Sequence, residues 1–588
     1  MGTTEAVKQK IRRELKGHQE PSLSSLVPPI ASGHVDEAVS ELLFFASPGV
    51  FFPLANAIME ELRCTFPTAD PLLQERMLEF LANFSIAMLS FLPRWNLSDR
   101  SRHDRALTNA QALLVARSSK ELATELVASA PGVAGILAAK WRREVLARLR
   151  SEGVSNPDKM ASEVVGRSIG SYVENLSFAV GTSNLRRIAE MRASGRTVTE
   201  ISNDYAAFLD YTLYLGASFV TCNPPLIDAA WTSNPQYWDG VVDTVISALP
   251  GENPDLLARS VTLEIVYSNM RLLRPIFLVS DGEMGYVSLQ VNPKRHDDCE
   301  AMIRDATAIY QELGGKLEGG VPNVVFKLPA TKAGLEAARE LTSQGIGVNI
   351  TVSFGLFQQL PFARVLNEGK AIFSTITHMT GRLAFAVRDE LLAKIATLES
   401  HGVTERMARE AAAWSGIAVL KKLHRALEQA RIDMSRVRPL VASLRVYDGD
   451  PFLGLPSPVP DITEALGTRI ITVFPNVRHA FDKALLEALD PCRIEVPVPA
   501  KALDILTFSE IFKQAYFVED DLTTRGDDQR FRPSQALSLG DEAGVTGWVP
   551  VHHTLQEFCQ SYDRFVQRIL ERKASRQPLN AGMATSST

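Results

Sequence analysis

The sequence predicts an α/β protein, a (β/α)8 TIM barrel with an N-terminal all-helical extension. After about residue 160, short apolar runs alternate with segments of helical periodicity. Before about residue 150, apolar stretches alternate with charged runs that suit amphipathic helices, and no strand alternation stands out. Eight strand-helix units in succession are the number that closes such a barrel.

The apolar runs give the predicted strands, and the periodic segments between them give the predicted helices. Helical periodicity fills 298–313 and 333–343, and each segment ends close to a glycine. Ser, Gly and Asn-Pro cluster at 151–158 and indicate a linker. We therefore divide the chain into a helical region of unknown role, 1–155, and a barrel with a C-terminal helix, 156–588. The predicted strands are 197–201, 218–222, 286–291, 323–328, 347–354, 371–377, 439–443 and 469–474.

Composition excludes several classes of function. The 588 residues include 62 Lys and Arg against 68 Asp and Glu, a formal net charge of −6, which offers no basic surface for nucleic acid. Five scattered cysteines without a CxxC pair predict a reducing, cytoplasmic compartment and no metal site. Residues 1–16 lack the apolar core of a signal peptide. The uncharged stretch 42–59 has the length of a membrane span, but its Ser-Pro-Gly and a further proline predict a turn between two buried helices.

Lys327 lies in the middle of a predicted buried strand. A buried ammonium without a partner is costly, so this side chain either reaches solvent at the rim or is kept because its perturbed amine does chemistry, as in a Schiff-base nucleophile. Unusual polar residues also lie at or near the ends of the other predicted strands, where barrel enzymes carry their catalytic groups. Their convergence favours the second interpretation. These residues are Asn223, Gln290, Asn349, Thr351, Ser443 and Arg445.

Seven motifs in order resemble those of the transaldolase family, over about residues 195 to 480. The segment 325–335, Val-Phe-Lys-Leu-Pro-Ala-Thr-Lys-Ala-Gly-Leu, resembles the Schiff-base strand of that family and the helix start after it. The segment 220–227, Val-Thr-Cys-Asn-Pro-Pro-Leu-Ile, is similar to the end of its second strand. The other similar segments are 286–293, 345–354, 377–382, 441–445 and 471–476.

The resemblance implies a cofactor-free enzyme in which Lys327 attacks a ketose carbonyl, forms an imine and allows the C3–C4 bond to break. Asn349 and Asn223 would hold substrate hydroxyl groups or the carbanion, Thr351 would orient a water, and Thr377 would bind substrate. Ser443, Arg445 and Arg382 would bind a terminal phosphate, for which an arginine fork is suited. From the residues alone, Asn223 before a proline is also a common turn residue, and both arginines could be rim salt-bridge partners.

Two positions depart from the family pattern. Gln290 stands where most transaldolases have a glutamate, and glutamine there is similar to the fructose-6-phosphate aldolase branch; it can position a water but cannot exchange its proton. The general acid/base of the family is an aspartate that ends the first strand. Asp204 is our candidate, although it could instead cap a helix, and Glu200 is the alternative.

Three functions follow as hypotheses. The first is a transaldolase that transfers a dihydroxyacetone unit between sugar phosphates, as in the pentose phosphate pathway. The second is a lyase of the same fold that releases dihydroxyacetone. The third is a non-catalytic barrel that binds sugar phosphates. The helical region 1–155 could cap the barrel, support a homo-oligomer or bind a partner.

Overall fold

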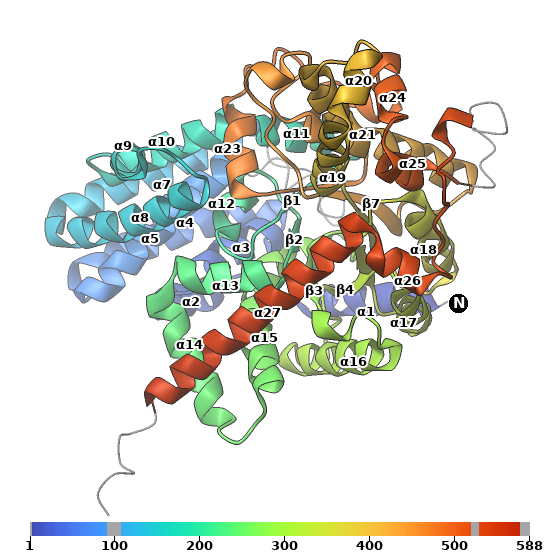
Figure 1. The fold of residues 1–588 in the computed structure, drawn as a ribbon. Helices are drawn as coiled ribbons and strands as arrows, with labels where there is room; N and C mark the ends of the chain where they lie inside the picture. The colour runs from blue at the N-terminus through green and yellow to red at the C-terminus, as the bar shows by residue number, and fades with distance from the viewer. Residues whose placement is uncertain (1–2, 91–107, 519–528, 577–588) are drawn as a thin grey trace, which may run out of the picture.

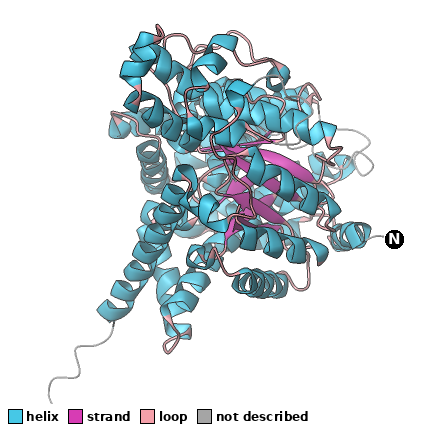
Figure 2. Cartoon of the chain, turned by 45° about the vertical axis from the view of Figure 1, so that its right-hand side comes forward, coloured by secondary structure: helices cyan, strands magenta, loops and turns pink. Residues whose placement is uncertain are grey.

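The centre of the molecule is a closed barrel of eight parallel strands in the order β1 to β8. The computed structural model describes residues 3–90, 108–518 and 529–576. Figure 2 shows the strands at the centre with helices around them, so the predicted barrel is confirmed. The strands are β1 (Glu200–Asn203), β2 (Phe219–Thr221), β3 (Tyr286–Gln290), β4 (Val324–Pro329), β5 (Val348–Thr351), β6 (Ser374–Met379), β7 (Val437–Ala442) and β8 (Ile470–Val473).

All eight predicted strands are present, although their ends differ from the predicted ones by up to three residues. The first and the sixth strands begin three residues later than expected and end two residues later. The fifth was expected to continue to residue 354 but ends at Thr351, because Val352 turns into the left-handed region with a φ of 54°. A β-branched residue rarely adopts this conformation. The seventh begins at Val437, where its pairing with Ser374 of β6 starts, two residues before the expected Pro439.

Helices cover the outside of the barrel between successive strands. They are α12 (Leu209–Tyr214), α13 (Pro224–Ser233), α14 (Pro235–Ala248), α15 (Pro254–Val279), α16 (Cys299–Lys316), α17 (Lys332–Ser343), α18 (Leu356–Glu368), α19 (Thr380–Ala393), α20 (Ile395–Ser400), α21 (Glu405–Gln429), α22 (Pro460–Thr463) and α23 (Pro475–Lys483). After the barrel come α24 (Ala500–Leu506), α25 (Glu510–Tyr516), α26 (Glu542–Gly547) and α27 (Val549–Arg576). Short 3-10 turns are η1 (Phe66–Thr68), η2 (Pro293–Arg295), η3 (Asp450–Phe452), η4 (Arg493–Glu495) and η5 (Gln529–Phe531).

The described residues before the barrel form helices, as predicted for 1–155, and the helices continue beyond that boundary to Ala193. These helices are α1 (Thr3–Gly17), α2 (Leu23–Ser32), α3 (Val35–Phe45), α4 (Pro48–Thr65), α5 (Pro71–Leu89), α7 (Asn109–Ser129), α8 (Pro131–Ser151), α9 (Pro157–Val165), α10 (Ile169–Thr182) and α11 (Asn184–Ala193). The uncharged stretch is broken between α3 and α4, with a proline opening α4, so the predicted turn is confirmed. Among the described residues, no helix is long and apolar enough to cross a membrane.

Helix α1 packs under the barrel, at the end where the strands begin. Ile11 is fully buried, and Thr4 donates a hydrogen bond to the carbonyl oxygen of Lys370 at 3.1 Å, shortly before β6. Arg12 pairs with Asp281, shortly before β3, at 3.0 Å. Most of the other N-terminal helices form a group beside the barrel (Figure 1). This group contacts the barrel helices where α3 packs against α15 and α8 packs against α23. Through α1, the N-terminal region therefore covers the end of the barrel where the strands begin.

Candidate active site

Lys327 projects into the barrel from β4. The strand register places it beside Gln290 of β3 and Asn349 of β5. Residues paired in this way on parallel strands project to the same side of the sheet, so the three side chains share the interior. Only 6% of Lys327 is exposed, so it does not reach solvent at the rim as the alternative interpretation required.

The interior changes the acidity of this amine. Burial lowers the pKa of Lys327, because the ammonium loses its hydration, while the nearby Asp204 and Cys222 act in the opposite direction. A lysine with a lowered pKa has a larger neutral fraction at pH 7, and the neutral amine is the form that attacks a carbonyl. The site thus favours a nucleophilic amine.

Asp204 lies directly after β1 and shares the interior with Lys327. Its backbone N–H donates to the carbonyl oxygen of Val473 at 3.1 Å, and its Oδ1 accepts a hydrogen bond from the hydroxyl of Thr221. Burial raises the pKa of Asp204, and the positive charge of Lys327 opposes that rise. The next helix, α12, begins at Leu209, so Asp204 does not cap it. The two groups are a carboxyl and an amine close enough to shift the pKa of one another.

A hydrogen-bonded group of polar side chains crosses the interior beside Lys327. Asn349 donates from Nδ2 to the hydroxyl of Ser288 at 2.8 Å and accepts at Oδ1 from the hydroxyl of Thr377 at 2.6 Å. These two bonds fix which way the Asn349 amide points. Thr351 follows at the end of β5, is almost fully buried, and lines a cavity of about 10 Å³ together with Lys327 and Leu555 of α27.

Asn223 and Gln290 lie at the ends of β2 and β3. The side-chain oxygen of Asn223 accepts from the backbone N–H of Leu226 at 3.0 Å and so caps α13, which matches its interpretation as a turn residue. The side-chain oxygen of Gln290 is buried and has no hydrogen-bond partner within the described part of the chain. A buried acceptor of this kind is available to a ligand or a water.

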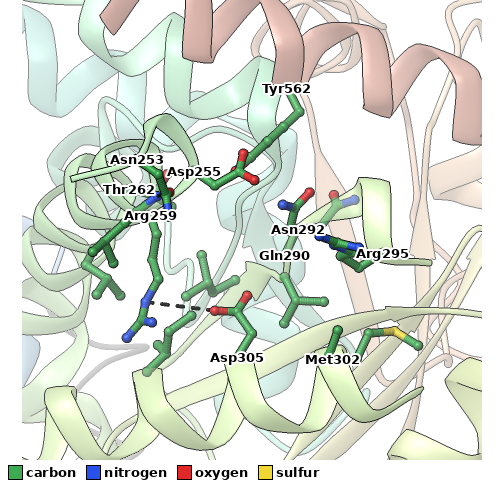
Figure 3. A pocket seen from close by; sticks show the side chains of 16 residues that line it. Asn253, Asp255, Arg259, Thr262, Gln290, Asn292, Arg295, Met302, Asp305 and Tyr562 are labelled. Atoms are coloured by element: carbon green, nitrogen blue, oxygen red, sulfur yellow. Dashed lines mark hydrogen bonds and ion pairs between the residues drawn. The ribbon is translucent and has the colours of Figure 1, made fainter. Parts of the chain in front are cut away.

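A larger cavity of about 300 Å³ lies on the outer side of β3, between α15, α16 and α27. Figure 3 shows Arg259 and Asp305 pointing toward one another across it, 3.8 Å apart, with the amide of Gln290 at its edge. Tyr562 of α27 donates a hydrogen bond from its hydroxyl to Asp255 of α15 at 3.0 Å. Lys327 does not line this cavity, so we do not assign the chemistry to it.

The proposed phosphate-binding residues meet between α19 and the segment after β7. The pKa of Arg445 is lowered by burial and by the neighbouring charge of Arg382. Ser443 has a φ of 62°, and its hydroxyl is buried without a hydrogen-bond partner among the described residues. Gly381 makes the approach possible, because a Cβ there would lie 2.3 Å from the carbonyl oxygen of Ser443. Two arginines and an unpaired hydroxyl form a candidate anion site.

Arg382 already has a partner in this structure. It donates from Nη1 and Nη2 to the two carboxylate oxygens of Glu557 on α27, at 2.6 and 2.8 Å. To this extent Arg382 matches its interpretation as a salt-bridge partner at the rim.

Glu200, the alternative acid/base, lies at the opposite end of β1 from Asp204. It is buried in an ion pair with Arg438, approaches Arg192 at 3.3 Å, and accepts from Ser218 at 3.1 Å. These partners engage its carboxylate at the start of β1, at the other end of the strand from Asp204, and so favour Asp204 over this alternative. Glu200 is a structural residue of the lower barrel.

We expect Glu200→Gln to destabilise the fold by about 3–5 kcal/mol, because it leaves the buried Arg438 guanidinium without its countercharge. Urea denaturation measures this change in unfolding free energy. Glu405→Gln is the control: its pair with Arg409 is exposed, so the loss should be less than about 1 kcal/mol. Equal shifts in the two variants would contradict the structural role of Glu200.

The lowered pKa of Lys327 predicts how imine formation depends on pH. The rate should rise with pH and level off below the ordinary pKa of a lysine, because only the neutral amine reacts. Asp204→Asn should move the midpoint lower still, since the Asp204 charge raises the Lys327 pKa. The measurement is the initial rate of imine formation with fructose 6-phosphate, quenched with borohydride at each pH. A midpoint typical of exposed lysines would contradict the burial effect.

Several residues at the site were not among the sequence candidates. Thr221 and Ser288 lie within the quoted motifs, two positions before the candidates Asn223 and Gln290. Residues two apart on a strand face the same side, so strand periodicity could have found them. Thr472 accepts from Ser202 at 3.0 Å and lies 3.2 Å from Thr221, which completes the polar interior. Glu557 lies on a helix with no motif, and no local signal marks it.

Comparison with known proteins finds matches to the barrel region. Residues 200–484 match the family model described as Transaldolase/Fructose-6-phosphate aldolase. A protein named Transaldolase 1 from Streptomyces avermitilis is 36% identical over 137 residues, 23% of this chain and 34% of that protein. A Transaldolase from Acidothermus cellulolyticus is 28% identical over 241 residues, 40% of this chain and 61% of that protein. A Transaldolase 2 from a Nostoc species is 30% identical over 145 residues, 24% of this chain and 35% of that protein. The chain thus covers between about a third and three fifths of the length of these relatives.

Proposed function

We propose that the protein is a transaldolase-type transferase without a cofactor, because residues 200–484 match the Transaldolase/Fructose-6-phosphate aldolase family model. It moves a dihydroxyacetone unit between sugar phosphates through an imine on Lys327. The observation that carries this proposal is the burial of Lys327 beside Asp204 within the barrel. Barrel enzymes carry their active sites at the ends where the strands finish, and both residues belong to that end.

In the first step the neutral Nζ of Lys327 attacks the ketose carbonyl. A C–N bond forms, the carbonyl oxygen leaves as water, and the protonated imine can accept an electron pair. Asn349, Thr377 and Asn223 would hold the substrate hydroxyl groups. The bonds from Asn349 to Ser288 and Thr377 support this role, because they orient the amide before substrate arrives.

In the second step the Asp204 carboxylate takes the proton of the C4 hydroxyl. The C3–C4 bond breaks, its electron pair moves into the imine, and the C4 end leaves as an aldehyde. The three-carbon enamine stays on Lys327 until an acceptor aldehyde arrives, and the steps then run in reverse. The burial that raises the pKa of Asp204 supports its return of the proton.

Gln290 and Thr351 would position the water that exchanges with the imine. A glutamine holds a water by hydrogen bonds but cannot transfer its proton at neutral pH, so Asp204 would supply proton transfer. Arg382, Arg445 and Ser443 would bind the terminal phosphate. The proximity of the two guanidinium groups and the unpaired Ser443 hydroxyl support that assignment.

Gln290 also favours a second candidate, a lyase that releases free dihydroxyacetone. Incubation with fructose 6-phosphate, with and without an aldose phosphate acceptor, distinguishes the two. A transferase gives little free dihydroxyacetone in either reaction and forms a new ketose phosphate only with acceptor. A lyase releases dihydroxyacetone without acceptor. Absence of cleavage in both reactions would contradict both enzymes and favour a barrel that only binds sugar phosphates.

A further inference from the structure

Helix α27 crosses the end of the barrel where the strands finish (Figure 1). The C-terminal half of α27 forms two ion pairs with the helices after β2. Arg568 pairs with Asp228 at 2.6 Å, and Arg572 pairs with Asp239 at 2.9 Å. The N-terminal half of α27, which we call its near half, carries Leu555, and Leu555 lines the small cavity beside Lys327. That cavity of about 10 Å³ has room for about one water molecule, so a six-carbon sugar needs part of its lining to move, and Leu555 makes α27 one of the lining segments.

The near half also carries Glu557, the partner of Arg382. The two hydrogen bonds of 2.6 and 2.8 Å run in parallel from the guanidinium to the carboxylate, which is the geometry that arginine also adopts with phosphate. The pKa of Glu557 is lowered, first by the bond from Arg382 and also by the charge of Arg445, so Glu557 is an anion at neutral pH. A carboxylate therefore occupies one arginine of the candidate phosphate site.

The other two groups of that site, the Arg445 guanidinium and the Ser443 hydroxyl, form no hydrogen bond with Glu557 among the described residues. Within the described residues, the Arg445 guanidinium donates to the carbonyl oxygens of Ser443 and Leu444, at 3.2 and 3.1 Å, and to no carboxylate. The Ser443 hydroxyl has no partner in the same part of the chain. A phosphate has three free oxygens and twice the charge of a carboxylate, so it can bind Arg382, Arg445 and Ser443 together.

We propose that Glu557 is an internal competitor for the phosphate end of the substrate. Its carboxylate holds Arg382 and keeps α27 over Lys327 in the empty enzyme, and a phosphorylated ketose displaces it. The inference rests on the proposed function for the identity of the phosphate site. As a consequence, the site selects ligands that carry an anionic end, because a ligand without one cannot release Arg382 from Glu557.

The test compares wild type, Glu557→Gln and the control Asp563→Asn, which removes the carboxylate of another ion pair of α27, the one with Lys294 at 2.8 Å. Binding of inorganic phosphate is measured by calorimetry, which needs no catalysis. We expect Glu557→Gln to bind phosphate about tenfold more tightly, because glutamine keeps the shape but not the charge, and Arg382 and Glu557 are 22% and 48% exposed, which moderates the effect. Asp563→Asn should bind as wild type does.

Two further readouts separate this inference from the proposed function. The double variant Arg382→Ala, Glu557→Gln should lose the gain in phosphate affinity. In wild type, phosphate should speed amide hydrogen exchange near residue 557, a measurement that needs no variant. Unchanged phosphate affinity in Glu557→Gln, or unchanged exchange in wild type, would overturn the inference even if Lys327 forms imines. Tighter phosphate binding without any imine would support the competitor and contradict the enzyme.

Discussion

Replacement of Lys327 by methionine is expected to lower the rate of ketose cleavage or transfer by roughly 10⁵-fold or more, because it removes the nucleophile of a covalent mechanism. The fold should not suffer. Burial lowers the pKa of Lys327, which means that the charged amine destabilises the folded state at neutral pH. A methionine side chain carries no charge and has no such cost. Steady-state rates and thermal unfolding measure the two effects, and we expect the melting temperature to be equal or higher.

Lys332→Met is the matched control for this prediction. Lys332 lies five positions further on, at the exposed start of α17, and donates from its backbone N–H to Glu542 rather than through its side chain. The control should keep wild-type activity. Residual activity of Lys327→Met close to wild type, with the protein folded, would show that the amine is not the nucleophile.

Asp204→Asn is expected to separate imine formation from carbon-carbon cleavage. The amide keeps the oxygen that accepts from Thr221 but cannot take the C4 proton, so cleavage should slow by roughly 10²–10⁴-fold while the imine still forms. Borohydride quenching followed by mass spectrometry should then find the six-carbon adduct in place of the three-carbon one. Cleavage at the wild-type rate would assign the acid/base step to another group.

The same measurement on Thr221→Val provides a graded comparison. This change removes the hydroxyl that donates to Asp204 but leaves the carboxylate itself. Because that hydrogen bond lowers the pKa of Asp204, its loss should raise the pKa further and shift cleavage to higher pH rather than stop it. A loss as large as that of Asp204→Asn would indicate that the hydroxyl does more than position and tune the carboxylate.

The barrel and much of its interior were accessible from the sequence, for identifiable physical reasons. Fully buried parallel strands read as short apolar runs, and a lysine or asparagine within such a run has few structural explanations. This singled out Lys327 and Asn349, which the structure brings together across β4 and β5. The strand ends were less accurate, because the turn at Val352 depends on a left-handed backbone that β-branched residues rarely adopt.

Contacts between distant segments were not accessible in the same way. Glu200 begins β1 and Asp204 follows its last residue with the same alternation, so only the partners that folding brings in, Arg438 and Thr221, distinguish the two carboxylates. Glu557 reaches Arg382 from 175 positions further along the chain, so no spacing rule predicts the pair. The N-terminal helices carry no chemical motif, and it is their packing that places α1 under the barrel.

The most direct test of the central claim is borohydride trapping of the wild-type protein with fructose 6-phosphate, followed by peptide mass spectrometry. The account predicts a reduced three-carbon adduct on Lys327, which requires both imine formation and C3–C4 cleavage. An adduct on another lysine, or no adduct with this and other ketose phosphates, would contradict the assignment of Lys327 as the Schiff-base nucleophile.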